Sequence, residues 1–156
     1  MAQQLVKVCI KIDASEWHGH ANESIWAEPV SGRSLLFRVA NSPFFARGIS
    51  HNDVVKALPT EDGLVFDFDR VVERSGHSTY MILAESDGSR FWTCWDALER
   101  KGCSYESTHI DLSVGRRLLL SVDVPSSADV REVYDLLERG EADQVWLFQE
   151  GYAYLA

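Results

Sequence analysis

Residues 78–102, STYMILAESDGSRFWTCWDALERKG, join a strand pattern to a helix pattern and define the architecture of the C-terminal half. The segment STYMILAE is predicted as a strand. Four apolar residues of the next segment, 90–101, recur at i, i+3, i+4 and i+7, the spacing of one apolar helix stripe: Phe91, Cys94, Trp95 and Leu98. Ser89 or Asp87 is expected to cap the start of this helix.

Strands and helices continue to alternate after this helix. Three more strands are predicted over residues 103–109, 117–124 and 145–154. Residues 110–116 are predicted as a loop. A second helix is expected to start at Ser126-x-x-Asp129, which has capping-box spacing, and to end just before Gly140. The order from Ser78 is therefore β-α-β-β-α-β, the ferredoxin-like pattern, in which two helices cover one face of a four-stranded antiparallel sheet.

The N-terminal half is predicted to consist of short strands joined by turns. Five strands are predicted over residues 5–12, 23–30, 34–40, 53–58 and 64–74. The first alternates strictly between two faces, as a half-buried strand does. We therefore expect an α+β protein in which a small antiparallel β-barrel or curved sheet (residues 1–77) packs on the ferredoxin-like unit (residues 78–156) as one compact body.

The composition predicts an ordinary soluble protein. Hydrophobic residues make up 46% of the 156 residues and charged residues 25%, and no apolar run approaches the ~20 residues that span a bilayer. Residues Met1–Gln4 lack the features of a signal peptide. Three widely spaced cysteines, Cys9, Cys94 and Cys103, form no disulfide framework. We expect a cytoplasmic protein without a membrane partner.

The charge of the chain points to the kind of partner it accepts. There are 24 acidic and 15 basic residues, a net charge of −9. Affinity for nucleic acid comes from Lys and Arg, so direct nucleic-acid binding is not expected. An acidic surface favours a basic partner. It also serves solubility alone, and both interpretations stay open.

Two histidine segments suggest chemistry. His18 and His20, with Glu23 nearby, are able to converge on a metal ion. No Cys pair or downstream His-x3-His supports that site, so a solvated polar loop is favoured. His51 lies two residues from Asp53, as a base and its orienter would, but no nucleophile motif accompanies them. A turn held by Asp53 is favoured.

The turn Ser75–Thr79, which contains His77, lacks the Lys of a phosphate-binding loop, so a hairpin turn is favoured over an anion site. Cys103 is a weak candidate nucleophile, with Arg100, Lys101 and His109 as possible neighbours. No catalytic residue, metal ligand or cofactor is therefore assigned.

Acidic and aromatic residues supply candidates for partner binding. Asp67, Asp69 and Glu73 are predicted to share one face of a strand. They are interpreted as solvated charges, as an acidic docking stripe, or as paired carboxylates for acid–base chemistry or a cation. Trp17 and Trp92 fall outside the predicted core positions and are interpreted either as interface anchors or as half-buried lids.

Several ordered motifs give the chain a family resemblance. The longest is NSPFFARGISHNDVV at residues 41–55. The others are the Trp-containing strand Glu23–Glu28, the Ser75–Thr79 turn, the Gly102-Cys103 step, the strand end Val122–Pro125 and the helix exit Glu138–Glu141. Together they resemble the bacterial family known as domain of unknown function 4265, over roughly residues 5–154. The resemblance implies no established activity. By analogy, small acidic proteins of this class include immunity proteins for polymorphic toxins.

These observations lead to two functional hypotheses. The first is a non-catalytic immunity protein that occludes the basic active-site cleft of a cognate antibacterial toxin. The expected contact residues are Trp17, Asp67, Asp69, Glu73 and Trp92. The alternative is a small-molecule-binding domain or small enzyme that uses the region of His51, Asp53 and His77, and it would show a mostly apolar cleft with convergent polar groups.

Overall fold

The computed structural model describes residues 4–155. The expectation that no signal peptide begins the chain concerns Met1–Gln4, of which residues 1–3 lie outside the described part. No helix among the described residues is long and apolar enough to cross a membrane.

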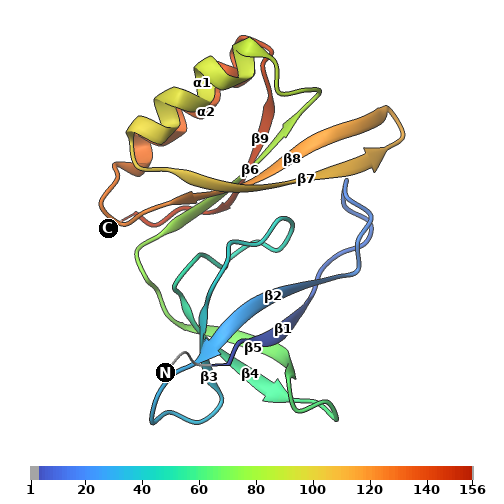
Figure 1. The fold of residues 1–156 in the computed structure, drawn as a ribbon, viewed down its shortest axis with the longest axis vertical. Coiled ribbons are helices and arrows are strands. Elements are labelled where there is room, and N and C mark those ends of the chain that lie inside the picture. The colour runs from blue at the N-terminus through green and yellow to red at the C-terminus, as the bar shows by residue number, and fades with distance from the viewer. Residues whose placement is uncertain (1–3, 156) are drawn as a thin grey trace.

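The N-terminal half forms a closed five-stranded barrel (Figure 1). Its strands are β1 (Val6–Lys11), β2 (Asn22–Pro29), β3 (Leu36–Val39), β4 (Val54–Pro59) and β5 (Val65–Glu73). Consecutive strands pair antiparallel, but β1 and β5 close the barrel in parallel, with Lys7 opposite Val65. The prediction of a purely antiparallel barrel was therefore wrong at this one pair. Five strands that alternate in direction leave the first and last pointing the same way, so closure requires a parallel pair.

The interior of the barrel follows the predicted alternation. Val6, Val8 and Ile10 of β1 are buried, whereas Lys7 and Lys11 are exposed. The same side of β2 and β3 contributes Ile25, Ala27 and other apolar residues to one core cluster. A barrel of this size is filled by side chains, and these buried residues form its packed core.

The C-terminal half is a four-stranded sheet covered on one face by two helices (Figure 1). Its elements are β6 (Ser78–Ala84), α1 (Ser89–Arg100), β7 (Ser104–Leu112), β8 (Gly115–Val124), α2 (Val130–Ala142) and β9 (Leu147–Tyr152). The predicted order β-α-β-β-α-β is confirmed. The strand order across the sheet is β7-β8-β6-β9, and all neighbours are antiparallel. The two sheets divide between Glu73 and Ser78, and the assignment of residues 1–77 and 78–156 as two subdomains of one compact unit stays a prediction.

Several local predictions about the helices were wrong. Gly88 is the N-cap of α1 and provides no side-chain hydrogen bond. Asp129, rather than Ser126, caps α2, where its carboxylate accepts hydrogen bonds from the backbone N–H groups of Arg131 and Glu132. Helix α2 also continues past Gly140 to Ala142. The absent side chain of Gly140 admits the Trp146 ring, since a Cβ there would lie 2.4 Å from Trp146 Cε2.

The predicted loop over residues 110–116 is instead a tight hairpin. Strand β7 continues to Leu112 and β8 already begins at Gly115, which pairs with Leu112. Gly115 has a φ of 120°, a conformation that glycine adopts without steric strain. The hairpin extends both strands, so β7 forms a nine-residue edge of the sheet.

The loop at residues 40–53, between β3 and β4, joins the barrel to the face of the sheet that the helices leave open. Phe44 and Phe45 pack against Met81 and Leu119 on that face. The Ser121 hydroxyl donates a hydrogen bond of 2.7 Å to the carbonyl of Pro43. We call this contact region the seam. It lies between the two halves in Figure 1, where the teal loop rises from the barrel towards the sheet.

Candidate functional site

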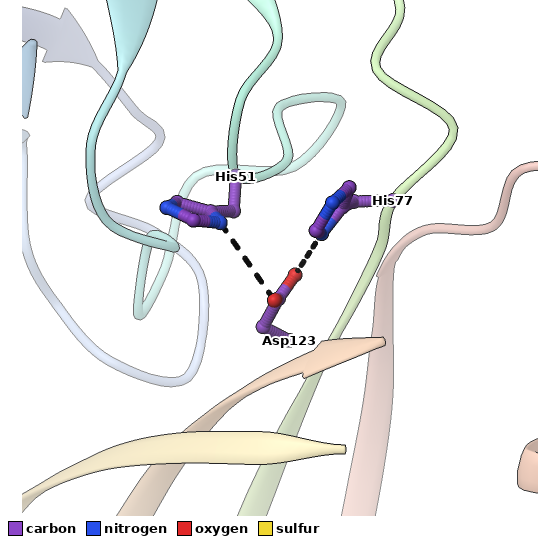
Figure 2. A group of neighbouring side chains, drawn as sticks. All are labelled: His51, His77 and Asp123. Atoms are coloured by element: carbon purple, nitrogen blue, oxygen red, sulfur yellow. Dashed lines mark hydrogen bonds and ion pairs between the residues drawn. The ribbon is translucent and has the colours of Figure 1, made fainter. Parts of the chain in front are cut away.

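Three polar side chains meet at one end of the seam: His51, His77 and Asp123 (Figure 2). His51 belongs to the seam loop, His77 to the connection between β5 and β6, and Asp123 to β8. The distance between His77 Nδ1 and Asp123 Oδ1 is 2.8 Å, and that between His51 Nδ1 and Asp123 Oδ2 is 3.7 Å. The two imidazole rings lie edge to face with centroids 5.4 Å apart. The carboxylate therefore stands between two imidazoles.

The backbone around the two histidines is fixed by local conformation. Asn52, directly after His51, has a φ of 67°, and Gly76, directly before His77, has a φ of 91°. A Cβ on Gly76 would also lie 3.0 Å from Ser126 Cβ, so the close approach to that residue favours glycine. Sequence reasoning noted this turn but not its role, which is to present His77 to β8.

Ser75 links the two histidine-bearing segments directly. Its hydroxyl donates a hydrogen bond of 2.7 Å to the carbonyl of His51 and accepts one of 3.1 Å from the backbone N–H of His77. One hydroxyl thereby sets the spacing of the two backbones. Side chains held by such outer contacts keep their orientation before any ligand arrives.

Asp53 supports this arrangement and does not pair with His51. Its side chain is fully buried and accepts hydrogen bonds from the backbone N–H groups of Ser50 and Ser75, each 2.9 Å long. The guanidinium of Arg74 lies 3.3 Å away and balances the charge. Asp53 therefore ties the two loops together, as the turn interpretation predicted. The carboxylate that faces His51 is Asp123.

Sequence reasoning missed Asp123. One signal was available, because residues 117–124 read RLLLSVDV and Asp123 is the acidic residue of this strongly apolar strand. Leu119, Ser121 and Asp123 follow each other at alternate positions of β8, and the first two contact the seam loop. Because this side of β8 faces the seam loop, a charged residue on it is expected to have a polar partner there.

A small cavity of about 160 Å³ lies beside the cluster. It is lined by residues of the seam loop, β7 and β8, namely Ala40, Asn41, Ser42, His51, Ser104, Tyr105, Glu106, Ser121 and Asp123. Its walls combine apolar surface with polar side chains, and this volume holds a few water molecules or a small ligand. The cavity gives the cluster a route to solvent.

His18, His20 and Glu23, which were considered from the sequence as metal ligands, make other contacts in the structure. The carboxylate of Glu23 accepts hydrogen bonds from the backbone N–H groups of Phe44, Phe45 and Ala46. His18 Nδ1 accepts a hydrogen bond from the His20 backbone. Glu23 therefore holds the seam loop in place, which accounts for its side chain without a metal ion.

Cys103 is not a nucleophile at neutral pH. It is buried, and burial together with the negative charge of Asp123 raises its pKa to about 12. Arg100 and Lys101, named as possible activating neighbours, do not lower this pKa. The thiol stays protonated and acts as a small apolar side chain.

The three acids predicted on one face of β5 are all exposed, but two of them are neutralised. Asp69 pairs with Arg70 at 2.7 Å and Glu73 with Arg33 at 2.5 Å. The pairing of β4 with β5 skips Asp69 and Val72, so the strict alternation that underlay the predicted stripe is interrupted. Asp67 has no ion-pair partner among the described residues.

The two predicted tryptophan anchors lie in separate places. The Trp17 side chain covers an apolar cavity of about 250 Å³ on the open face of the sheet, and its indole N–H donates a hydrogen bond of 3.0 Å to Gln149 Oε1. Trp92 is partly buried on α1 and packs against Phe91 and Tyr105. Helix α1 and strand β5 lie at opposite ends of the molecule (Figure 1). The five predicted contact residues therefore do not form one patch.

The structure brings Asp67 together with apolar residues that sequence reasoning did not select. Lys7 of β1 pairs with Trp26 of β2 on one side and with Val65 of β5 on the other. Two residues further along β5, Asp67 lies opposite Leu58 of β4. The exposed apolar side chains of this region, together with Asp67, are named here the barrel wall patch: Leu5, Trp26, Leu58, Leu64 and Asp67. Trp26 is 45% exposed and Leu64 47%. Closure by the parallel pair places β1, which pairs with the Trp26 strand, beside β5, which carries Asp67.

Comparisons with known proteins place the chain in a family. Among solved structures, it is similar to a crystal structure of a hypothetical protein from Neisseria gonorrhoeae, with a TM-score of 0.72 and 18% sequence identity over 100% of this chain and 99% of that chain. This likeness concerns the fold. No curated protein matches the chain. The family model described as "Domain of unknown function (DUF4265)" matches residues 23–148, which is most of the sequence. The chain therefore belongs to the DUF4265 family.

Proposed function

We propose that this protein is a non-catalytic binding protein whose partner is a basic protein domain. The barrel wall patch carries the proposal, because it combines an exposed Trp and three exposed Leu side chains with an acidic residue that has no ion-pair partner in the described chain. Interfaces typically place aromatic and aliphatic anchors at the centre of a patch and charges around them.

The charge of the chain supports a basic partner. With a net charge of −9, the protein attracts a positively charged surface and accelerates the encounter with it. Asp67 lies within the patch, where a Lys or Arg of the partner gains a short-range contact. Lys7 stacks over the Trp26 ring, with its Nζ 5.4 Å from the ring centroid, and holds the indole against the barrel wall.

The sharper form of the proposal is an immunity protein that neutralises a cognate antibacterial toxin. A toxin that acts on nucleic acid or nucleotides has a basic cleft, and an acidic surface with apolar anchors is suited to block it. The mechanism is occlusion, in which the bound protein excludes the substrate. This form rests on charge and on class analogy.

We also infer that the sheet β7-β8-β6-β9 with α1 and α2 is a ferredoxin-like unit. The element order and the placement of both helices on one face support this assignment. A cytoplasmic location is part of the proposal and is supported by the three cysteines, all of which are free thiols.

Co-expression with the product of the neighbouring gene tests the function. The wild-type chain is expected to co-purify with that product and to protect the cells from it. Because interface hot spots contribute about 2 kcal/mol or more, Trp26→Ala should weaken the complex by roughly 30-fold or more. Asp67→Lys should slow association, with a smaller effect at roughly 0.5 M salt, where the Debye length is about 4 Å.

Tyr134→Ala is the matched control for Trp26→Ala, because Tyr134 is an aromatic residue of α2 that is 39% exposed, against 45% for Trp26, and lies far from the barrel wall patch. It should bind like the wild type. If the wild-type chain left the cells unprotected, the immunity function would be ruled out. If Tyr134→Ala weakened the complex as much as Trp26→Ala does, the barrel wall patch would be ruled out as the binding surface.

A further inference from the structure

We propose that His51, His77 and Asp123 bind a divalent first-row transition-metal ion, of the class of Zn²⁺, at the seam between the barrel and the sheet. The proposal goes beyond protein binding and is independent of it, because the cluster and the barrel wall patch share no residue. It also revises the expectation from sequence that the chain has no metal ligands.

The ligand set fits this class of metal. Two imidazole nitrogens and one carboxylate oxygen are favoured by Zn²⁺ and its neighbours in the first transition series, whereas Mg²⁺ and Ca²⁺ prefer oxygen ligands alone. The three residues come from three different segments of the chain, so the site exists only in the folded protein.

The distances between the ligand atoms are close to those of a tetrahedral site. With metal–ligand bonds of roughly 2.0–2.1 Å, tetrahedral geometry separates ligand atoms by about 3.4 Å. His77 Nδ1 lies 2.8 Å from Asp123 Oδ1 and His51 Nδ1 lies 3.7 Å from Asp123 Oδ2, so each imidazole is near this spacing from one oxygen of the carboxylate. One ligand atom from each residue lies within 4.8 Å of the others. Small side-chain rotations are therefore enough to enclose an ion.

His51 carries a polar atom that the protein itself leaves unsatisfied. Its Nδ1 is buried and has no hydrogen-bond partner, although it points towards Asp123 (Figure 2). A buried nitrogen without a partner is unfavourable, because it has lost its hydrogen bonds to water. A metal ion between His51 and Asp123 supplies the missing partner.

The supporting contacts are already in place. The Ser75 hydroxyl bridges the backbones of His51 and His77, and the buried carboxylate of Asp53 anchors Ser50 and Ser75. Ligands held in this way lose little freedom when they bind a metal ion, and such outer contacts contribute strongly to metal affinity.

The surroundings favour a cation and leave it accessible. The side chains of His51, His77 and Asp123 are 32%, 15% and 17% exposed, so the cluster is shielded but not sealed. The adjoining cavity contains Glu106, and neither Lys nor Arg is among its lining residues. A water molecule or small ligand in this cavity is placed to complete the coordination of the ion.

The test uses the full chain, freed of metal with a chelator, and titrates it with Zn²⁺ by calorimetry and with Co²⁺ by visible absorption. We expect one ion per chain and Co²⁺ d–d bands typical of a site with nitrogen and oxygen ligands. His51→Ala, His77→Ala and Asp123→Asn should each weaken Zn²⁺ binding by about 100-fold or more, since outer contacts alone contribute 10- to 100-fold. Mg²⁺ should not compete.

His20→Ala and His109→Ala are the controls, because both side chains are exposed and lie outside the cluster. They should bind Zn²⁺ like the wild type. Each variant is also unfolded thermally in the presence of chelator. Wild-type Tm should rise with added Zn²⁺, while the Tm of folded His77→Ala should not, because only a native state that binds the ion is stabilised by it.

Two results would overturn the proposal. One is a wild-type chain that binds Zn²⁺ no more tightly than Mg²⁺, which would make the cluster a hydrogen-bonded ion pair only. The other is loss of binding in His20→Ala with retention in folded His77→Ala, which would place the site at His18 and His20.

Discussion

The two ends of the seam hold the barrel to the sheet by different means, and one face of β8 shows the change along its length. Leu119 lies under Phe44 and Phe45, Ser121 donates a hydrogen bond to Pro43, and Asp123 faces two histidines beside a cavity. The apolar end buries side chains and contributes stability. The polar end is ordered from behind by Asp53 and stays accessible, as a ligand site requires.

The largest expected effect tests whether Asp53 organises the polar end. Asp53→Asn removes a fully buried charge that accepts two backbone hydrogen bonds, and it leaves Arg74 without its partner. We expect a loss of about 3 kcal/mol in the free energy of unfolding, at the lower end for a broken buried pair. Urea denaturation followed by tryptophan fluorescence measures it.

Asp123→Asn is the matched comparison for Asp53→Asn. Asp123 is partly exposed and bonded only to side chains, so its loss should change the free energy of unfolding by less than about 1 kcal/mol. Equal losses for the two variants would contradict the distinction between a structural and an accessible carboxylate.

A smaller effect is expected at the apolar end. Phe45 packs between the His20 ring, which stacks on it at 4.5 Å, and the cluster of Met81 and Leu119. Because Phe45 is only partly buried, Phe45→Ala should lower the free energy of unfolding by about 2 kcal/mol, less than for a core Phe. Urea denaturation again provides the measurement.

Trp26→Ala is the control for Phe45→Ala. Its indole is largely exposed on the barrel wall patch, so the stability should change by no more than about 0.5 kcal/mol. A large loss for Trp26→Ala would show that the patch is part of the barrel's own packing, which would weaken its assignment as a docking surface.

The smallest expected effect is a loss of stability at alkaline pH, which depends on the thiol of Cys103 near Asp123. Burial, and second the charge of Asp123, raise the pKa of Cys103 from 9.0 to about 12 in the folded chain. Between pH 9.0 and about 12, the folded state keeps the thiol proton of Cys103 and the unfolded state loses it. Stability is therefore complete below pH 9.0 and falls by at most about 1.4 kcal/mol per pH unit as the pH rises towards 12.

Urea denaturation at about pH 8 and about pH 9.5 should show a loss of about 0.8 kcal/mol, and Cys103→Ala should reduce it. Cys9→Ala, in the barrel, serves as the control and should keep the wild-type dependence. If Cys103→Ala and the wild type lose the same stability over this range, other groups account for the alkaline sensitivity.

Most of the elements could be predicted from the sequence because they depend on local periodicity. The alternation in residues 5–12 and the apolar stripe of α1 each bury one face whatever surrounds them. Helix ends were less predictable. Gly140 looked like a helix stop, but it lies inside α2 because Trp146 needs the space that a side chain would fill.

The candidate site was only half visible in the sequence. His51 and His77 drew attention through their chemistry, and Asp53 was paired with His51 because it is a near neighbour in the chain. Asp123 lies 46 residues beyond His77 and carries no motif. The exposure of Trp26 was equally hidden in the sequence. Its strand could be predicted, but whether its side chain is exposed depends on how the barrel closes.

The sequence by itself determined the alternation of faces, the two helices, the acidic charge and the membership suggested by residues 41–55. These features arise from neighbours in the chain and from composition. Only the tertiary structure decided that β1 closes on β5, that Asp123 meets His51 and His77, and that Leu58 lies opposite Asp67. Contacts between distant segments depend on how the sheets close and pack, and local periodicity contains no information about that geometry.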